Sequence, residues 1–190
     1  MKGDNTVERE ETLALLKQHV TNKNLVNHSI AVEKIMIALA ERLGEDVALW
    51  SLAGLLHDID YDQTATEPLL HGRVGADMLK EHGGFSEELI YAVLVHNHVH
   101  GLPRLSVLDK ALYAADPLSG LIVAGALIHP EKRLAPLTPD FIIKRFGEKA
   151  FARGANREQI ATCSEIGLEL EEFITIGLLA MQQHASEIGL

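Results

Sequence analysis

Apolar residues recur at intervals of three and four along most of this chain, which is the period of an α-helix with one buried face. One such stripe carries His28, Val32, Ile35 and Leu39. Alternating strand patterns extend over no more than a few residues, so the sequence predicts an all-α fold. The pattern predicts successive helices over residues 10–20, 25–43, 46–56, 71–81, 86–96, 106–116, from about 119, from 138, 156–167 and 169–188.

Several helix boundaries carry their own signals. Ser86 and Ser106 are predicted to cap the N-termini of two helices. Proline at a first helical position marks another start at Thr138-Pro139. Asp116-Pro117 is expected to end the helix that begins at Ser106, and a short apolar helix is expected after it. Surface loops are expected over residues 61–70 and 101–104.

A chain of 190 residues is most simply one domain, which we expect to span residues 1–190. Within it, the candidate chemistry lies between about residues 20 and 120. A polar connection over residues 130–139 is expected to lead into a C-terminal helical extension over about residues 138–190.

Composition and charge restrict the classes of function. Apolar content of 47% and charged content of 23% are those of an ordinary globular protein. The net charge of −10 and the lack of a basic stripe argue against binding of a nucleic acid polymer. A single cysteine, Cys163, rules out a disulfide framework within the chain. No apolar signal segment is seen, and the longest apolar run, residues 121–128, is far below the ~18 residues of a membrane span. We therefore expect a cytoplasmic protein without membrane association, either a monomer or a homodimer.

The doublet His57-Asp58 follows the apolar run 50–56 and is the strongest chemical signal in the sequence. Burying an unpaired imidazole or carboxylate costs several kcal/mol, so such a pair needs a strong partner. Four further residues that can bind a metal lie on or beside the buried stripes of other predicted helices, at His28, His71, His96 and Asp116.

Imidazole and carboxylate ligands suit Fe, Mn, Co, Ni or Zn. Six ligands exceed the three or four that one catalytic zinc takes, and they fit two ions about 3.5–4 Å apart. Asp58 is the natural bridging ligand, because it is central in the order and adjacent to His57. Each residue alone has a simpler interpretation, as a hydrogen-bonded core histidine or, for Asp116, a helix cap near Pro117. The convergence of all six favours a metal centre.

These residues resemble the HD superfamily of metal-dependent phosphohydrolases, named for its His-Asp doublet. The family pattern falls on His28, His57-Asp58 and Asp116, and the extra histidines of its two-metal branch match His71 and His96. The resemblance covers about residues 20–120, and segments 53–61, 110–116 and 151–158 are similar to a small HDIG-type branch. It implies a helical bundle that hydrolyses a phosphoester of a nucleotide or other small phosphorylated metabolite with a metal-activated water.

The chain also departs from known members. Asp60 stands where the HDIG motif has glycine. The segment 96–103 is similar to cyclic-di-GMP phosphodiesterases but lacks their Glu, Asp and Gly-Tyr-Pro residues. The chain also lacks the Glu-Asp pair of guanosine-tetraphosphate hydrolases and the Gly-His-Pro-Phe-Gly-His run of dNTP triphosphohydrolases. The best-known substrates are therefore disfavoured one by one.

Residues near the expected ligands supply candidates for the remaining roles. His98 and His100 are candidates to bind substrate and to donate a proton to the leaving group, His98 foremost, and the alternative is that both are exposed loop histidines. Arg73 is a candidate phosphate contact or a solvated charge. Asp60 and Asp62 either orient ligands or form a solvated turn.

Two other classes of function remain open at this point. Some HD relatives use the same ligand set for di-iron oxygenase chemistry, and the ligand pattern does not separate the two. The third alternative is a non-catalytic regulatory module that binds a metal or ligand.

Overall fold

The computed structural model describes residues 7–148 and 150–190, which contain helices and no strand, so the all-α prediction is confirmed. The N-terminal part comprises α1 (Arg9–His19), α2 (Lys23–Leu43), α3 (Val47–Leu56), α4 (Tyr61–Thr64), α5 (Arg73–His82) and α6 (Glu87–Val95). A short 3-10 helix, η1 (His98–His100), precedes the long helix α7 (Val107–Ile128). The C-terminal part comprises α8 (Pro139–Gly147), α9 (Arg157–Ala161), η2 (Thr162–Ile166), α10 (Leu170–Gln183) and α11 (Ala185–Ile188).

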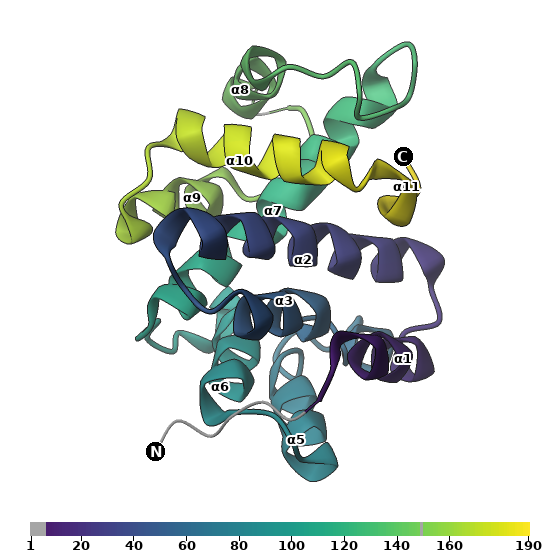
Figure 1. Cartoon of the computed structure of the whole chain (residues 1–190), viewed down its shortest axis with the longest axis vertical. Helices are drawn as coiled ribbons and strands as arrows, with labels where there is room; N and C mark the ends of the chain where they lie inside the picture. The colour runs from purple at the N-terminus through teal and green to yellow at the C-terminus, as the bar shows by residue number, and fades with distance from the viewer. Residues whose placement is uncertain (1–6, 149) are drawn as a thin grey trace.

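Helix α2 runs through the middle of the molecule (Figure 1). It packs against α3 on one side and α10 on the other, and it also contacts α7 and α11. Helices α5 and α6 pair with each other, and α6 joins the bundle through α3 and α7. Helix α7 extends from α6 to α8, so it links the N-terminal helices to the C-terminal ones.

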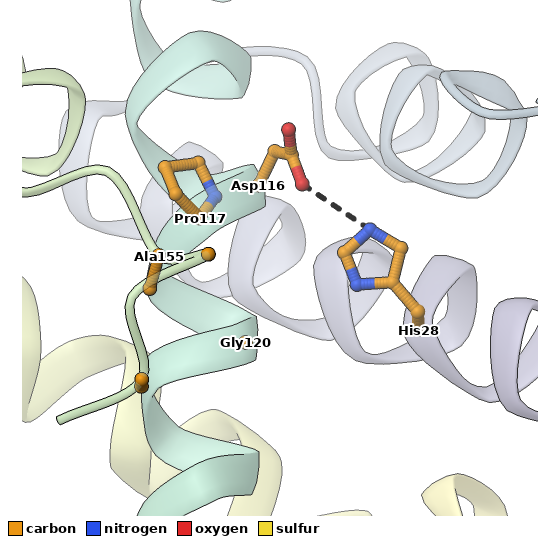
Figure 2. A pocket seen from close by; sticks show the side chains of 7 residues that line it. His28, Asp116, Pro117, Gly120 and Ala155 are labelled. Atoms are coloured by element: carbon orange, nitrogen blue, oxygen red, sulfur yellow. Dashed lines mark ion pairs between the residues drawn. The ribbon is translucent and has the colours of Figure 1, made fainter. Parts of the chain in front are cut away.

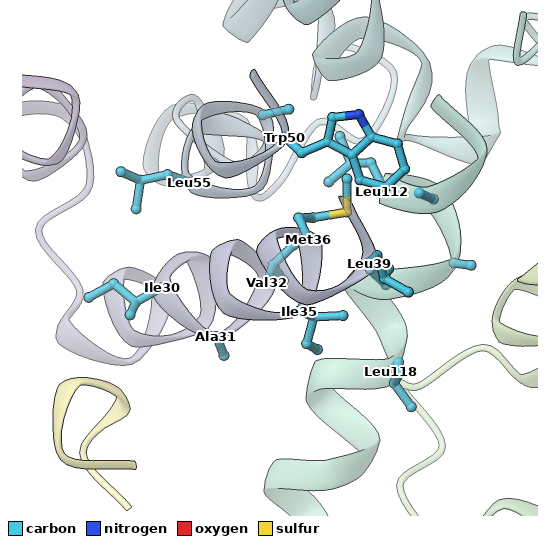
Figure 3. Packing of buried hydrophobic residues seen from close by; sticks show 14 of the residues in the cluster. Ile30, Ala31, Val32, Ile35, Met36, Leu39, Trp50, Leu55, Leu112 and Leu118 are labelled. Carbon is cyan, nitrogen blue, oxygen red and sulfur yellow. The ribbon is translucent and has the colours of Figure 1, made fainter. Parts of the chain in front are cut away.

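The apolar stripe of α2 forms the centre of the core, as its sequence predicts (Figure 3). Val32, Ile35 and Leu39 are fully buried, and the stripe faces Trp50 of α3 and Leu118 of α7. Helix α3 is buried from Leu49 to Leu56, which explains why its sequence is apolar on all sides.

Gly54 allows α3 to approach the α2 backbone closely. A Cβ built at this position would lie 2.8 Å from Cα and 2.9 Å from N of Glu33. Because the next residues of the chain lead to His57 and Asp58, this close approach also sets the position of the doublet.

The predicted N-terminal caps are confirmed. The Ser86 hydroxyl accepts from the Leu89 N–H, and Ser106 forms a reciprocal capping box with Asp109. Pro139 occupies the first turn of α8, capped by Thr138.

The prediction that Asp116-Pro117 ends a helix is wrong, because α7 continues through both residues to Ile128. Proline lacks an N–H, so the carbonyl four residues earlier, that of Tyr113, loses its usual partner. The Gln159 side chain donates to this carbonyl at 2.8 Å. A residue distant in sequence thus satisfies the group that the proline leaves open.

Three other boundaries differ from the prediction. His71 precedes α5, separated from it by Gly72 at a φ of 84°, where the pattern predicted a helix beginning at residue 71. The expected loop over residues 61–70 begins with the short helix α4. The two C-terminal helices are each divided, into α9 with η2 and into α10 with α11. Gly167, whose backbone adopts the left-handed conformation, ends η2.

Among the described residues, one helix is long and apolar enough to cross a membrane by length and composition, namely α7. Its most apolar window is 61% buried inside the protein, as in the core helix of a bundle.

Candidate metal centre

Five segments of the fold bring the six candidate ligands together. His28 lies on α2, His57 caps the C-terminus of α3, and Asp58 follows it. His71 precedes α5, His96 caps the C-terminus of α6, and Asp116 lies within α7. The six side chains form one cluster, in which Asp58 lies beside all four histidines and Asp116 lies beside His28.

The first half of the cluster surrounds one oxygen of Asp58. Its Oδ2 lies 3.5 Å from Nε2 of His28 and 3.5 Å from Nε2 of His57. The Nε2 atoms of His28 and His57 are 3.2 Å apart. Asp116 Oδ1 lies 3.2 Å from Nε2 of His28.

The second half surrounds the other oxygen of the same carboxylate. Asp58 Oδ1 lies 3.2 Å from Nε2 of His71 and 3.5 Å from Nε2 of His96. These two Nε2 atoms are 3.1 Å apart. Each oxygen of Asp58 therefore faces its own pair of histidines.

These separations fit metal coordination. Metal–nitrogen bonds of 2.0–2.1 Å place neighbouring ligand atoms about 2.9–3.4 Å apart in octahedral or tetrahedral geometry. Most of the separations between ligand atoms in the two halves fall in or next to this range, and both histidine–Asp58 groups could hold a metal ion.

In each of the four clustered histidines, the nitrogen that faces away from the centre, Nδ1, makes a hydrogen bond. Nδ1 of His57 donates to the Gly54 carbonyl at 2.8 Å, and Nδ1 of His96 donates to that of Val93 at 2.6 Å. Nδ1 of His28 donates to the Ser119 hydroxyl at 3.0 Å, which in turn donates to the Asp116 carbonyl. With Nδ1 held as a donor, Nε2 is the nitrogen that each neutral imidazole presents to the centre.

Asp60 holds the fourth histidine. Its Oδ1 accepts from Nδ1 of His71 at 2.9 Å, and its Oδ2 accepts from the backbone N–H groups of Gly72 and Gly75. The side chain is fully buried. Of the two alternatives for Asp60, the structure shows the orienting contact and not a solvated turn.

The electrostatics of the cluster follow from pairing of imidazoles with carboxylates. Burial opposes the charge of Asp58, but the surrounding histidines hold the pKa of its carboxyl well below the usual range. Burial likewise opposes the charge of His71, yet Asp58 and Asp60 raise its pKa to about 10. Burial lowers the pKa of His57. The carboxylates thus supply negative charge where a cation would bind.

Two cavities open onto the cluster. A cavity of about 340 Å³ adjoins His28 and Asp116 and is otherwise lined by Pro117, Gly120, Ala152, Gly154 and Ala155 (Figure 2). A second, of about 240 Å³, adjoins His71, His96 and Asp116 and is also lined by Asn97, His98, Pro117, Gly154, Asn156 and Gln159. The two meet at Asp116, Pro117 and Gly154.

The other predicted site residues differ in whether they line a cavity. His98 is exposed and lines the second cavity. His100 donates from Nε2 to the His71 carbonyl at 2.7 Å and is not among the residues that line the two cavities. Arg73 is exposed, donates to Nδ1 of His100 and is not among the residues that line the two cavities. Asp62 is exposed and accepts from the backbone and side chain of Thr21.

The sequence pattern missed the residues that frame the mouth of the site. Ala152, Gly154 and Gln159 belong to the C-terminal part of the chain, and no ligand-like residue type marks them. Asn97 was also missed, although its amide donates to the carbonyls of Pro68 and His71 and so fixes the loop that carries a ligand. Only the similarity of segment 151–158 to the HDIG-type branch pointed to this region.

Comparison with known proteins identifies the family. Residues 25–121 match the HD domain, and this region contains all six clustered residues. The chain belongs to the HD-domain family. Members of this family are mostly metal-dependent hydrolases.

Individual relatives of this HD domain differ in how much they share. The chain is 34% identical to an uncharacterized protein of Methanocaldococcus jannaschii over 155 residues, or 75% of this chain and 86% of the relative. It is 38% identical over 98 residues to ribonuclease Y of Desulfotalea psychrophila, covering 52% of this chain and 18% of that enzyme. It is 29% identical over 127 residues to the symmetrical bis(5'-nucleosyl)-tetraphosphatase of Bacillus subtilis, covering 57% of this chain and 67% of that enzyme. The chain therefore spans less than a fifth of the ribonuclease. No solved structure matches the chain.

Proposed function

We propose that this HD-domain protein is a metal-dependent phosphohydrolase with a dinuclear centre, which cleaves a phosphoester of a nucleotide or other small phosphorylated metabolite. The observation that carries the proposal is the division of Asp58 between two histidine pairs, one on each oxygen. The two relatives with assigned activities are a ribonuclease and a bis(5'-nucleosyl)-tetraphosphatase, which supports a hydrolase.

The residues of this chain would hold two divalent ions of Fe, Mn, Co, Ni or Zn. His28, His57 and Asp116 would bind one, His71 and His96 the other, and Asp58 both. Such ions, when bound, supply charge for the phosphoryl oxygens and lower the pKa of water from 15.7 toward about 7.

The protein contributes orientation and shape. The hydrogen bonds at Nδ1 hold each imidazole in the tautomer that binds a metal through Nε2. The two cavities leave room for a substrate beside Asp116, at the point where they meet. His98 lines the second cavity, and within the described residues its imidazole makes no hydrogen bond to the protein. Its ring nitrogens are therefore available to a substrate, and we assign it the proton transfer to the leaving group.

The test combines metal analysis with a phosphoester panel. The purified protein is analysed for bound metal and then assayed with nucleoside monophosphates, p-nitrophenyl phosphate and bis-p-nitrophenyl phosphate in the presence of Mn, Co, Ni, Fe or Zn. Asp58→Asn should abolish turnover and reduce metal content. Asp62→Asn is the matched control, because Asp62 is an exposed carboxylate outside the cluster.

The outcomes separate the candidate classes. Hydrolysis of a phosphomonoester or phosphodiester without oxygen uptake supports the hydrolase and excludes the oxygenase. Oxygen consumption by the iron form without hydrolysis of any phosphoester would establish the oxygenase instead. Full activity in a folded Asp58→Asn variant would contradict the proposed centre.

A further inference from the structure

The cavity beside His71 and His96 continues to two carboxamides, Asn156 and Gln159. Both lie outside residues 25–121, the region matched to the HD domain. Gln159 is only 6% exposed, yet it lines the cavity. A buried amide beside a candidate metal centre is positioned to contact whatever binds there.

Contacts with the protein fix the orientation of both amides. The Gln159 Nε2 donates to the Tyr113 carbonyl that Pro117 leaves open, so its Oε1 is the group that remains to accept a hydrogen bond. The Asn156 Oδ1 accepts from the backbone N–H groups of Glu158 and Gln159, so its NH₂ group remains as a donor. The cavity wall therefore offers one acceptor and one donor, three residues apart.

Outside the six clustered residues, the walls of the two cavities contain no carboxylate, lysine or arginine among the described residues. Within residues 7–148 and 150–190, no lysine or arginine lines either of the two cavities. The nearby Arg157 is occupied by backbone carbonyls, among them those of Phe151, Ala152 and Ala155. Arg104 pairs with Glu165 and covers the Tyr113 ring. The walls of the two cavities thus offer no lysine or arginine to a chain of several phosphates, and the exposed Arg153, between the lining residues Ala152 and Gly154, is not among the lining residues. An uncharged polar group would find hydrogen-bond partners there.

We propose that Gln159, together with Asn156, determines substrate specificity by binding the uncharged, nucleobase-like part of a substrate whose single phosphoryl group lies at the metal centre. A carboxamide acceptor and a carboxamide donor match the adjacent donor and acceptor on the edge of a nucleobase. A site that hydrogen-bonds such a group discriminates strongly against ligands that lack it, because the oxygen of the buried Gln159 is then left unpaired; Asn156 is exposed. The inference rests on the proposed function for the position of the phosphoryl group.

The test measures binding and not turnover. The protein loaded with Mn²⁺ is titrated by calorimetry with methylphosphonate and with the four ribonucleoside 5′-methylenephosphonates, whose P–C bonds are not hydrolysed. At least one nucleoside phosphonate should bind about tenfold or more tightly than methylphosphonate. Nucleoside 5′-diphosphate analogues in which CH₂ replaces both the 5′ oxygen and the oxygen between the phosphorus atoms should gain little further affinity.

Variants locate the source of this preference. Gln159→Leu should lower the ratio of the two affinities about tenfold and leave methylphosphonate binding unchanged. Asn156→Asp keeps the oxygen that caps α9, so it retains the fold, and it should also lower the ratio because the donor is lost. Gln182→Leu is the matched control: Gln182 also donates to backbone carbonyls, those of Leu134 and Leu137, but lies outside both cavities.

Three results would overturn the inference. In the first, no nucleoside phosphonate binds more tightly than methylphosphonate. In the second, folded Gln159→Leu and Asn156→Asp both retain the wild-type ratio. In the third, Gln159→Leu weakens both ligands equally, which would indicate a structural role alone. A preference that depends on Gln159, in a protein that hydrolyses no phosphoester, would contradict the proposed function and support this inference.

Discussion

Replacement of Asp60 by asparagine tests how the structure prepares the second half of the centre. The carboxylate accepts three hydrogen bonds, one from Nδ1 of His71 and two from the backbone N–H groups of Gly72 and Gly75. Asparagine has the same shape but offers one oxygen and one NH₂ group. If its oxygen faced His71, the NH₂ group would meet two N–H donors. The less costly orientation therefore keeps the oxygen on the backbone and turns the NH₂ group toward His71.

That orientation reverses the tautomer of His71. Its Nδ1 becomes an acceptor, and its Nε2 carries the proton toward Asp58, so Nε2 no longer presents a lone pair. One charged hydrogen bond is lost, which is worth about 1.5–3 kcal/mol. This agrees with the roughly 10–100-fold loss of metal affinity that follows removal of such a partner.

Calorimetric titration of Asp60→Asn with Zn²⁺ should therefore show one of two binding steps weakened about 10–100-fold. The step assigned to His28 and His57 should remain close to wild type, because Asp60 contacts neither residue. Asp62→Asn should leave both steps unchanged, because Asp62 is exposed and accepts hydrogen bonds from Thr21 and not from a clustered histidine. Two unchanged steps in a folded Asp60→Asn protein would refute this account of the orienting contact.

Three further predictions follow from the fold and the charges. Gly54→Ala should lower the free energy of unfolding by about 1–3 kcal/mol in urea, because its Cβ would meet the Glu33 backbone at 2.8 Å; Gly120→Ala, with no atom within 4 Å, is the control, and an equal loss in both would show that packing is not the cause. Glu33→Gln should lower the free energy of unfolding by about 3 kcal/mol, because the fully buried Glu33 carboxylate accepts hydrogen bonds from Arg9 and Ser51. Glu165→Gln, at an exposed ion pair, should lower it by less than about 1 kcal/mol. A similarly small loss at Glu33 would contradict the prediction. Binding of Zn²⁺ at pH 7 should release protons, because His71 has a pKa of about 10 before a metal displaces its proton. The apparent affinity for Zn²⁺ should therefore rise as pH increases from 7 toward 10. Equal heats of binding in buffers of different ionisation enthalpy would exclude this proton release.

The sequence predicted the bundle well where one helical face is buried. The stripe of α2 that begins at His28, and the apolar segment that ends at His57, occur in the structure as expected. Local periodicity suffices there because a helical face can be deduced from residues three and four apart.

The prediction failed where distant residues decide the outcome. Pro117 was expected to end a helix, and only the folded chain reveals that Gln159 satisfies the carbonyl of Tyr113. The orientation of His71 likewise depends on Asp60 and Asn97, whose side chains come from outside α5. The placement of segment 151–156 over the mouth of the site is a long-range contact with no periodic signal.

Anomalous diffraction from crystals of the Mn²⁺-loaded protein would show whether Asp58 bridges two metal ions. We predict two peaks per chain, one beside His28, His57 and Asp116 and one beside His71 and His96, each within bonding distance of a different oxygen of Asp58. A single peak, or two peaks of which one does not contact Asp58, would contradict the account.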